Sequence, residues 1–277
     1  MEKCLALVMG GGGARGALQV GACRALFEAG FKPDLLVGTS IGAINSAGLG
    51  LLGVNMDGVA ALEKAYQNMA EGHMMDTPGK LVLHTLTGRP DYTSKRAREL
   101  LIALGITQDL RFSHIQNARL GLVSADMSTG QLVIYGRNPE QSVLEGVLAS
   151  CAVPPWFAPI ENDDQLIVDG GALSLLPIEP ALTLGATEII ALDLSGSPTP
   201  SRPSRKLSQL EKSASAFIRR ETYLETTLAE ARGVPVRYMQ LLSNPPIQMW
   251  DFSTYKNLLT TGYETASRYL SDWDETG

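Results

Sequence analysis

Three short apolar segments of this chain each end in a glycine-containing turn. The segments and their turns are Leu5–Met9 with Gly10–Gly13, Leu35–Val37 with Gly38–Gly42, and Leu166–Val168 with Asp169–Gly171. A short, uninterrupted apolar run is typical of a strand that is buried on both faces of a parallel sheet. The three segments therefore predict an α/β protein with a glycine turn at the end of three of its strands.

Periodicity along the rest of the chain predicts alternating strands and helices. Further strands are expected at 119–125, 131–135, 188–192 and 234–242, and helices at 14–29, 43–48, 60–70, 95–104, 207–231 and 255–273. The 277 residues, 44% of them apolar, are enough for one large α/β domain rather than two. We expect a doubly wound, mostly parallel sheet with helices on both faces.

Charge and cysteine content argue against several classes of protein. The net charge is −6 and no basic run stands out, so no nucleic-acid partner is expected. Cys4, Cys23 and Cys151 are odd in number and widely spaced, which fits a reducing compartment rather than a disulfide framework or a zinc site. The first apolar run is too short for a signal peptide, and no stretch reaches the roughly 18 apolar residues of a membrane span. A cytoplasmic protein is expected.

The first glycine turn, Gly10–Gly16, is suited to binding an anion because its backbone N–H groups lie where a helix begins. Gly11, Gly13 and Gly16 match the dinucleotide fingerprint G-x-G-x-x-G. That fingerprint also needs an acidic residue at the end of the second strand, whereas Asp34 precedes that strand. A dinucleotide phosphate, an oxyanion and a plain tight turn therefore remain as three interpretations.

The second turn contains Ser40 within Gly38-Thr39-Ser40-Ile41-Gly42. Between a strand and a helix, G-x-S-x-G makes a sharp turn that exposes the serine oxygen, and its two glycines relieve the crowding. The third turn, Asp169-Gly170-Gly171, could be an ordinary surface turn. The strand that precedes each turn favours a functional interpretation of both.

The proton of Ser40 needs a base, and the sequence offers no histidine in the position that a catalytic histidine usually takes. In α/β-hydrolases the catalytic triad follows the chain order Ser, acid, His, but no histidine follows Asp169 here. The three histidines, His73, His84 and His114, fall in the polar middle region. A buried aspartate with a raised pKa can accept the serine proton directly, so Ser40, Asp169 and glycine N–H groups make a complete nucleophilic set.

These turns, in this order, resemble the patatin-like phospholipases. The likeness rests on Gly11–Gly16, Gly38–Gly42, Asp169–Gly171, the block Ala149–Pro159 and the segment Ser124–Gly130. It implies a three-layer α/β/α sandwich with a core at 5–195, followed at 196–277 by a linker and a C-terminal helical extension of the same domain. It also implies a carboxylic ester hydrolase of the phospholipase A or lysophospholipase type.

The resemblance assigns roles to individual residues. Ser40 would be the nucleophile and Asp169 the base of a catalytic dyad. The amides of Gly11, Gly12 and Gly13 would form the oxyanion hole, with Arg15 beside it. Gly16, Gly38, Gly42, Gly170 and Gly171 would support the three turns. No cofactor is expected, and no metal, since no carboxylate cluster has calcium-loop spacing.

The expected partner is a lipid or phospholipid acyl ester, and peripheral contact with the inner membrane surface is left open. Met74, Met75 and Leu81–Leu83 could make that contact or could pack in the core or a lid. A catalytically idle lipid-binding or regulatory protein is the main alternative, and a dinucleotide-binding protein is the second. The substrate head group, the chain length and the oligomeric state are not determined by the sequence.

Overall fold

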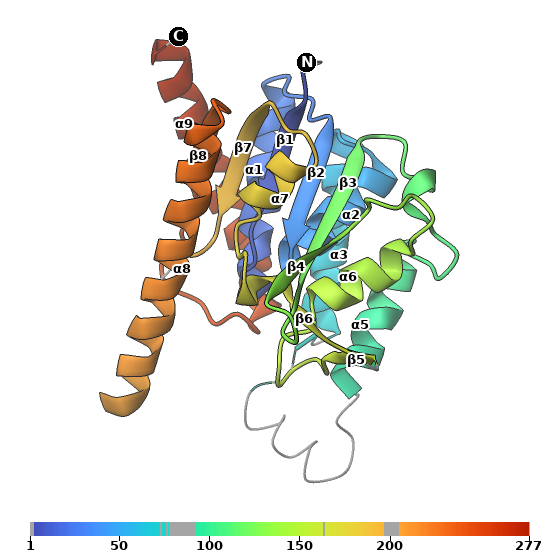
Figure 1. Cartoon of the computed structure of the whole chain (residues 1–277). Helices are drawn as coiled ribbons and strands as arrows, with labels where there is room; N and C mark the ends of the chain where they lie inside the picture. The colour runs from blue at the N-terminus through green and yellow to red at the C-terminus, as the bar shows by residue number, and fades with distance from the viewer. Residues whose placement is uncertain are drawn as a thin grey trace.

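A single sheet organises the protein (Figure 1). The computed structural model describes residues 3–72, 74–75, 77, 92–162, 164–196 and 205–276. The strands are β1 (Leu5–Met9), β2 (Leu35–Thr39), β3 (Arg119–Asp126), β4 (Gln131–Tyr135), β5 (Ile160–Asn162), β6 (Gln165–Asp169), β7 (Glu188–Asp193) and β8 (Val236–Gln240). Their order is β5-β6-β3-β2-β1-β7-β8, with β4 also paired to β3.

Helices cover both faces of this sheet (Figure 1). They are α1 (Gly16–Glu28), α2 (Ile41–Leu52), α3 (Met56–Glu71), α5 (Tyr92–Ala103), α6 (Val143–Ser150), α7 (Ile178–Thr183), α8 (Arg205–Ala231) and α9 (Tyr255–Thr276). Short 3₁₀ turns are η1 (Gly13–Arg15), η2 (Phe112–His114), η3 (Gly170–Ala172) and η4 (Phe252–Thr254). One face is covered mainly by α1, α2, α3 and α9, and the other by α7 and α8.

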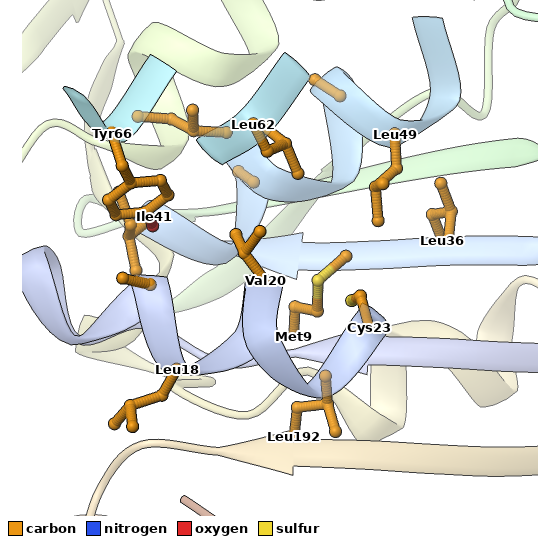
Figure 2. Close-up of a cluster of buried hydrophobic side chains, with 14 of the residues drawn as sticks. Met9, Leu18, Val20, Cys23, Leu36, Ile41, Leu49, Leu62, Tyr66 and Leu192 are labelled. Carbon is orange, nitrogen blue, oxygen red and sulfur yellow. The ribbon is translucent and has the colours of Figure 1, made fainter. Parts of the chain in front are cut away.

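The apolar run of β1 is buried on both faces, as its sequence predicts. Leu7 and Met9 point into the cluster beneath α1 and α2, whereas Ala6 and Val8 point into the cluster beneath α7. All four side chains are fully buried. Figure 2 shows the first cluster, in which Met9 lies among side chains of α1, β2 and β7. Burial of each large side chain contributes about 1.5–3 kcal/mol, so these central strands hold the layers together.

The predicted three-layer α/β arrangement with a mostly parallel sheet is confirmed, and one edge departs from it. Strands β3, β2, β1, β7 and β8 are parallel, but β4 and β6 run antiparallel to β3, and β5 runs antiparallel to β6. Helices α6 and α7 were not predicted, because 8 and 6 residues are too few for a clear helical period. Helix α1 begins at Gly16 because the preceding residues form the turn η1.

Strand β6 pairs with the last residues of β3, beyond the part of that strand that pairs with β2. Residues 119–123 of β3 pair with β2, and residues 124–126 pair with β6. β4 pairs with residues 122–126 of β3 and thus overlaps both partners. Since a strand has two edges, β2 and β6 must share the edge opposite β4. Their carboxyl ends, Thr39 and Asp169, therefore meet head to head.

Candidate active site

Ser40 occupies a strained turn between β2 and α2. Its φ of 57° and ψ of −125° make it the one non-glycine residue with a positive φ in the described part of the chain. Such a conformation persists only where the surroundings enforce it, and it is typical of a nucleophile elbow. A Cβ on Gly38 would collide with the carbonyl of Gly42, and a Cβ on Gly42 would collide with that of Met9. The two motif glycines are therefore required by close backbone packing.

The last residues of α6 hold both peptide groups of Ser40. The Ser40 N–H donates to Oγ of Ser150 at 2.9 Å, and that hydroxyl donates to the carbonyl of Val123 at 2.5 Å. The Cys151 thiol donates to the carbonyl of Ser40 at 3.3 Å. Burial of this thiol, and secondarily the charge of Asp169, raise its pKa well above the ordinary value. Cys151 therefore stays a neutral donor, and the two residues fix the strained turn.

Asp169 ends β6 next to this turn. Its backbone N–H donates to the carbonyl of Ala152 at 2.9 Å, and its Oδ1 accepts the N–H of Gly171 at 2.7 Å. A Cβ on Gly170 would collide with the carbonyl of Val123, so the turn lies directly against β3. Ser150, Cys151 and Ala152 thus hold the serine turn and the aspartate turn together.

The Asp169 carboxyl is matched to proton transfer near neutral pH. Burial raises its pKa from 3.8 to about 6, while hydrogen bonding to Ser40 and to the N–H of Gly171 opposes that rise. Oδ2 of Asp169 is buried and has no partner at standard hydrogen-bond distance and angle within the described part of the chain. The Ser40 hydroxyl interacts with this carboxyl, which also keeps one oxygen without a hydrogen-bond partner among the described residues. A base of this pKa can accept a proton from a serine.

The glycine turn lies beside Ser40. A Cβ on Gly11 would lie 3.2 Å from Cβ of Ser40. The Gly11 N–H already donates to the carbonyl of Leu175 at 2.9 Å, and the Ala14 N–H donates to that of Met249 at 2.7 Å. Gly12 and Gly13 have N–H groups that donate no hydrogen bond within the described residues.

Another free donor follows Ser40 directly. The N–H of Ile41, the first residue of α2, makes no hydrogen bond with any residue that the structure describes. The first N–H groups of a helix have no partner within the helix, so they are available to an anion. Sequence reasoning did not select Ile41, although the residue after the serine is the usual donor of a nucleophile elbow.

Arg15 supports the glycine turn from its far end. Its Nε donates to the carbonyl of Gly12 at 3.1 Å, and it interacts with the carboxylate of Asp193. Burial lowers the pKa of the guanidinium, and Asp193 counteracts this. Since the side chain binds a carbonyl of the turn, it orients the Gly12–Gly13 peptide.

A buried chain of amide side chains fixes the start of the same turn. Gln19 donates to the carbonyl of Gly10 at 2.8 Å and accepts a hydrogen bond from Asn45 at 2.9 Å. Tyr66 in turn donates to Asn45 at 3.2 Å. Gly16 is needed here, because a Cβ would collide with the Tyr66 hydroxyl, and Figure 2 shows Tyr66 beside Ile41. Sequence reasoning missed these residues; the available signal was one glutamine among the apolar residues of α1.

A cavity of about 420 Å³ lies between the end of α3 and the segment 248–253, and this segment contacts the glycine turn through the hydrogen bond from Ala14 to Met249. Met69, Met74, Trp250 and Phe252 line it, together with shorter polar side chains. One side of its wall lies near the buried amide side chains, since the Phe252 ring is 6.2 Å from the ring of Tyr66.

An aromatic pair joins this wall to the block after α6. Trp250 stacks on Trp156 with ring centroids 5.7 Å apart. Met74 and Met75 are buried, which fits core packing rather than membrane contact for these two residues. Leu81–Leu83 lie outside the described residues.

The positions of Asp34 and His114 bear on two alternatives from the sequence, a dinucleotide site and a histidine base. Asp34 accepts the N–H of Leu5 at 2.8 Å, at the amino ends of β1 and β2 and thus opposite the glycine turn. It therefore cannot bind a ribose at that turn. His114 lies just before β3, also at the opposite end from Ser40, and its Nδ1 accepts the N–H of Arg111 at 3.3 Å. His73 and His84 lie outside the described residues.

The described residues contain neither a metal-binding cluster nor a membrane-spanning helix. Among these residues, no group of three His, Cys, Asp or Glu side chains could hold a metal ion. None of the helices in the same part of the chain combines the length and apolar character that crossing a membrane requires.

Comparison with known proteins gives related sequences and folds. An uncharacterized NTE family protein of Mycobacterium tuberculosis is 34% identical over 206 residues, 72% of this chain and 32% of that protein. Patatin-like phospholipase domain-containing protein 7 of Mus musculus is 25% identical over 310 residues, 99% of this chain and 21% of that protein. The chain thus spans about a third or less of the length of these relatives.

A solved structure and a family sequence profile also match this chain. The crystal structure of VipD from Legionella pneumophila matches 98% of this chain and 67% of its own, with a TM-score of 0.48 and 17% identity. The sequence profile of the family described as patatin-like phospholipase matches residues 7–182, the region that contains all three turns. This chain therefore belongs to the patatin-like phospholipase family, a membership that supports a lipid hydrolase at the level of the family.

Proposed function

We propose that this protein hydrolyses acyl esters of lipids or phospholipids through a dyad of Ser40 and Asp169. The observation that carries the proposal is the meeting of a strained serine turn with a buried carboxyl whose pKa is about 6. The family membership supports the same class of reaction. A lipid-binding protein without activity would have no need for the strain at Ser40, so that alternative is less well supported.

The first half of the reaction forms an acyl-enzyme. Asp169 accepts the Ser40 proton as Oγ bonds to the ester carbonyl carbon, and the carbonyl oxygen becomes an oxyanion. Free N–H groups of Gly12, Gly13 and Ile41 stabilise that charge, and each such donor is worth about 3–4 kcal/mol. The ester C–O bond then breaks, and Asp169 returns the proton to the alcohol that leaves.

The second half regenerates the enzyme with the same groups. A water molecule attacks the acyl carbon while Asp169 accepts its proton. The new oxyanion collapses, the bond to Ser40 Oγ breaks, and the proton returns to Ser40. The products are a carboxylic acid and the alcohol. In this scheme Gly11 and Arg15 orient the turn, because their donor groups already bind Leu175 and Gly12.

We assign the acyl chain to the cavity between α3 and the segment 248–253. Its methionine and aromatic lining is apolar and adaptable, which suits a flexible hydrocarbon chain. The polar side chains at its rim would face water or a head group.

Labelling with a long-chain alkyl fluorophosphonate tests this proposal. We expect one adduct per chain, located by mass spectrometry at Ser40, without added calcium or cofactor. Ser40→Ala should abolish both the adduct and the hydrolysis of p-nitrophenyl esters and phospholipids. An adduct on a different serine, or no adduct on folded protein, would show that Ser40 is not the nucleophile.

A further inference from the structure

Two carboxylates of α8 contact the segment that joins the aspartate turn to α7. Glu225 is 6% exposed. Its Oε1 accepts the Ser174 hydroxyl at 2.5 Å, and its Oε2 accepts the N–H of Glu179 at 2.8 Å. Glu221, one helical turn earlier, is hydrogen-bonded to Glu225. Buried acids cost free energy unless they are paired, so their presence here points to a role beyond packing.

The same segment holds two parts of the active site through its backbone. The carbonyl of Ser174 accepts the Thr39 hydroxyl at 3.0 Å, and Thr39 directly precedes the nucleophile. The carbonyl of Leu175 accepts the Gly11 N–H at 2.9 Å. Ser174 and Thr39 are both fully buried, so water cannot replace the bond between them. A shift of this segment would therefore move the serine turn and the glycine turn together.

We propose that Glu225 and Glu221 of α8 are positioning residues, which act through Ser174 and Leu175 to keep the Ser40 turn and the Gly11–Gly13 amides in reactive geometry. This inference rests on the function proposed above. It gives α8, which lies beyond the region that the family profile matches, a part in turnover. Neither carboxylate touches substrate, so their contribution is to orientation.

The pair keeps its geometry by sharing one proton. Burial, and then the hydrogen bond and charge of Glu225, raise the pKa of Glu221, so its carboxyl stays protonated and can donate to an ionised Glu225. Asp193 of β7 adds to that rise; it is itself hydrogen-bonded to Tyr238 of β8 and interacts with Arg15. Loss of the shared proton at alkaline pH would leave two adjacent buried charges, which repel each other.

The test compares kcat and KM for a p-nitrophenyl ester in four variants. We expect Glu225→Ala and Ser174→Ala each to lower kcat about tenfold or more, with KM within about threefold, because misplacement of reacting groups mainly affects the transition state. Glu221→Ala should lower kcat to a similar extent, again with little change in KM. Glu230→Gln, on the exposed face of the same helix, is the matched control and should keep wild-type values.

A conservative variant separates positioning from plain stability. Glu221→Gln retains a donor to Glu225 but has no proton to lose, so it should restore the kcat lost in Glu221→Ala and extend activity to higher pH than wild type. Circular dichroism and thermal unfolding should show each variant folded at the assay temperature.

The outcomes distinguish this inference from the proposed function. If wild-type protein hydrolyses esters and Ser40→Ala does not, the dyad stands. If Glu225→Ala and Ser174→Ala then match Glu230→Gln in kcat, the positioning role is wrong. A loss of kcat that merely follows the unfolded fraction, with no recovery in Glu221→Gln, also overturns it. Wild-type protein without esterase activity would instead refute the proposed function itself.

Discussion

The hydroxyl of Ser150 accepts the backbone N–H of Ser40 at 2.9 Å, across 110 positions of sequence. This bond joins the end of α6 to the one non-glycine residue with a positive φ among those described. Ser150 is fully buried and also donates to Val123. The serine turn is therefore maintained by a residue that belongs to neither of its flanking elements.

The variant Ser150→Ala should impair hydrolysis because it leaves the Ser40 N–H without an acceptor. A buried unsatisfied group costs about 1–3 kcal/mol, and relaxation of the turn would misplace the nucleophile. We expect kcat to fall about 10- to 100-fold. Ser142→Ala is the control, since Ser142 caps the other end of α6 through the N–H of Glu145. Equal activity in both variants would show that the bond does not position Ser40.

The pH dependence of hydrolysis should report Asp169. As the base, it must be ionised, so kcat/KM should rise with pH and reach half its plateau near pH 6, the pKa that burial gives it. A p-nitrophenyl ester, which does not ionise in this range, is the suitable substrate. A profile that is flat from pH 4.5 to pH 7.5 would contradict the assignment of the base.

Replacing the base should stabilise the protein while it abolishes activity. The folded-state pKa of Asp169, about 6, lies above its ordinary value of 3.8, so this group favours folding below pH 3.8 and loses that contribution as the pH rises through 6. The difference corresponds to about 3 kcal/mol at most. Asp169→Asn should therefore raise the free energy of unfolding by about 1–3 kcal/mol at pH 8 and by much less at pH 4, as measured by urea denaturation.

The glycine turn should be more sensitive in kcat than in KM. In Gly12→Ala the new Cβ would lie 2.9 Å from Cβ of Leu194, which a change of rotamer cannot move, so we expect the turn to shift and carry its amides away from the oxyanion. Because that charge exists only in the transition state, we expect kcat to fall about 100-fold while KM changes little. A raised KM with unchanged kcat would point to ground-state anion binding at this turn instead.

The assignment of the acyl chain can be tested by filling the cavity. Ala70 lines it from α3, so Ala70→Leu should lower kcat/KM for long-chain p-nitrophenyl esters more than for p-nitrophenyl acetate. We expect the ratio of the two kcat/KM values to fall about tenfold or more. Ala60→Leu, on the exposed side of the same helix, should leave the chain-length profile unchanged. A uniform loss across chain lengths in Ala70→Leu would place the acyl chain elsewhere.

The central strands could be predicted from the sequence because local pattern determines them. Leu5–Met9 is apolar at every position and is buried on both faces, and the glycines around Ser40 are needed where two backbones touch. Both features leave a mark on consecutive residues, so an apolar run or a motif is enough to find them.

The meeting of Ser40 with Asp169 was decided by tertiary structure. The turns themselves are visible in the sequence, but their contact depends on β6 running antiparallel along the free part of β3. The register between strands more than 40 positions apart comes from the packing of the whole sheet, so local patterns do not contain it.

The hydrogen bonds that hold the site have the same origin. Gln19 and Glu225 lie in no motif, and the block that contains Ser150 does not specify its partner. The partners of Ser150, Gln19 and Glu225 lie 110, 9 and 51 positions away. Each is a buried polar side chain that must find a partner once the layers close. The sequence determined which groups could react, and the closed core decided which polar side chains would hold them in place, because only burial forces such pairing.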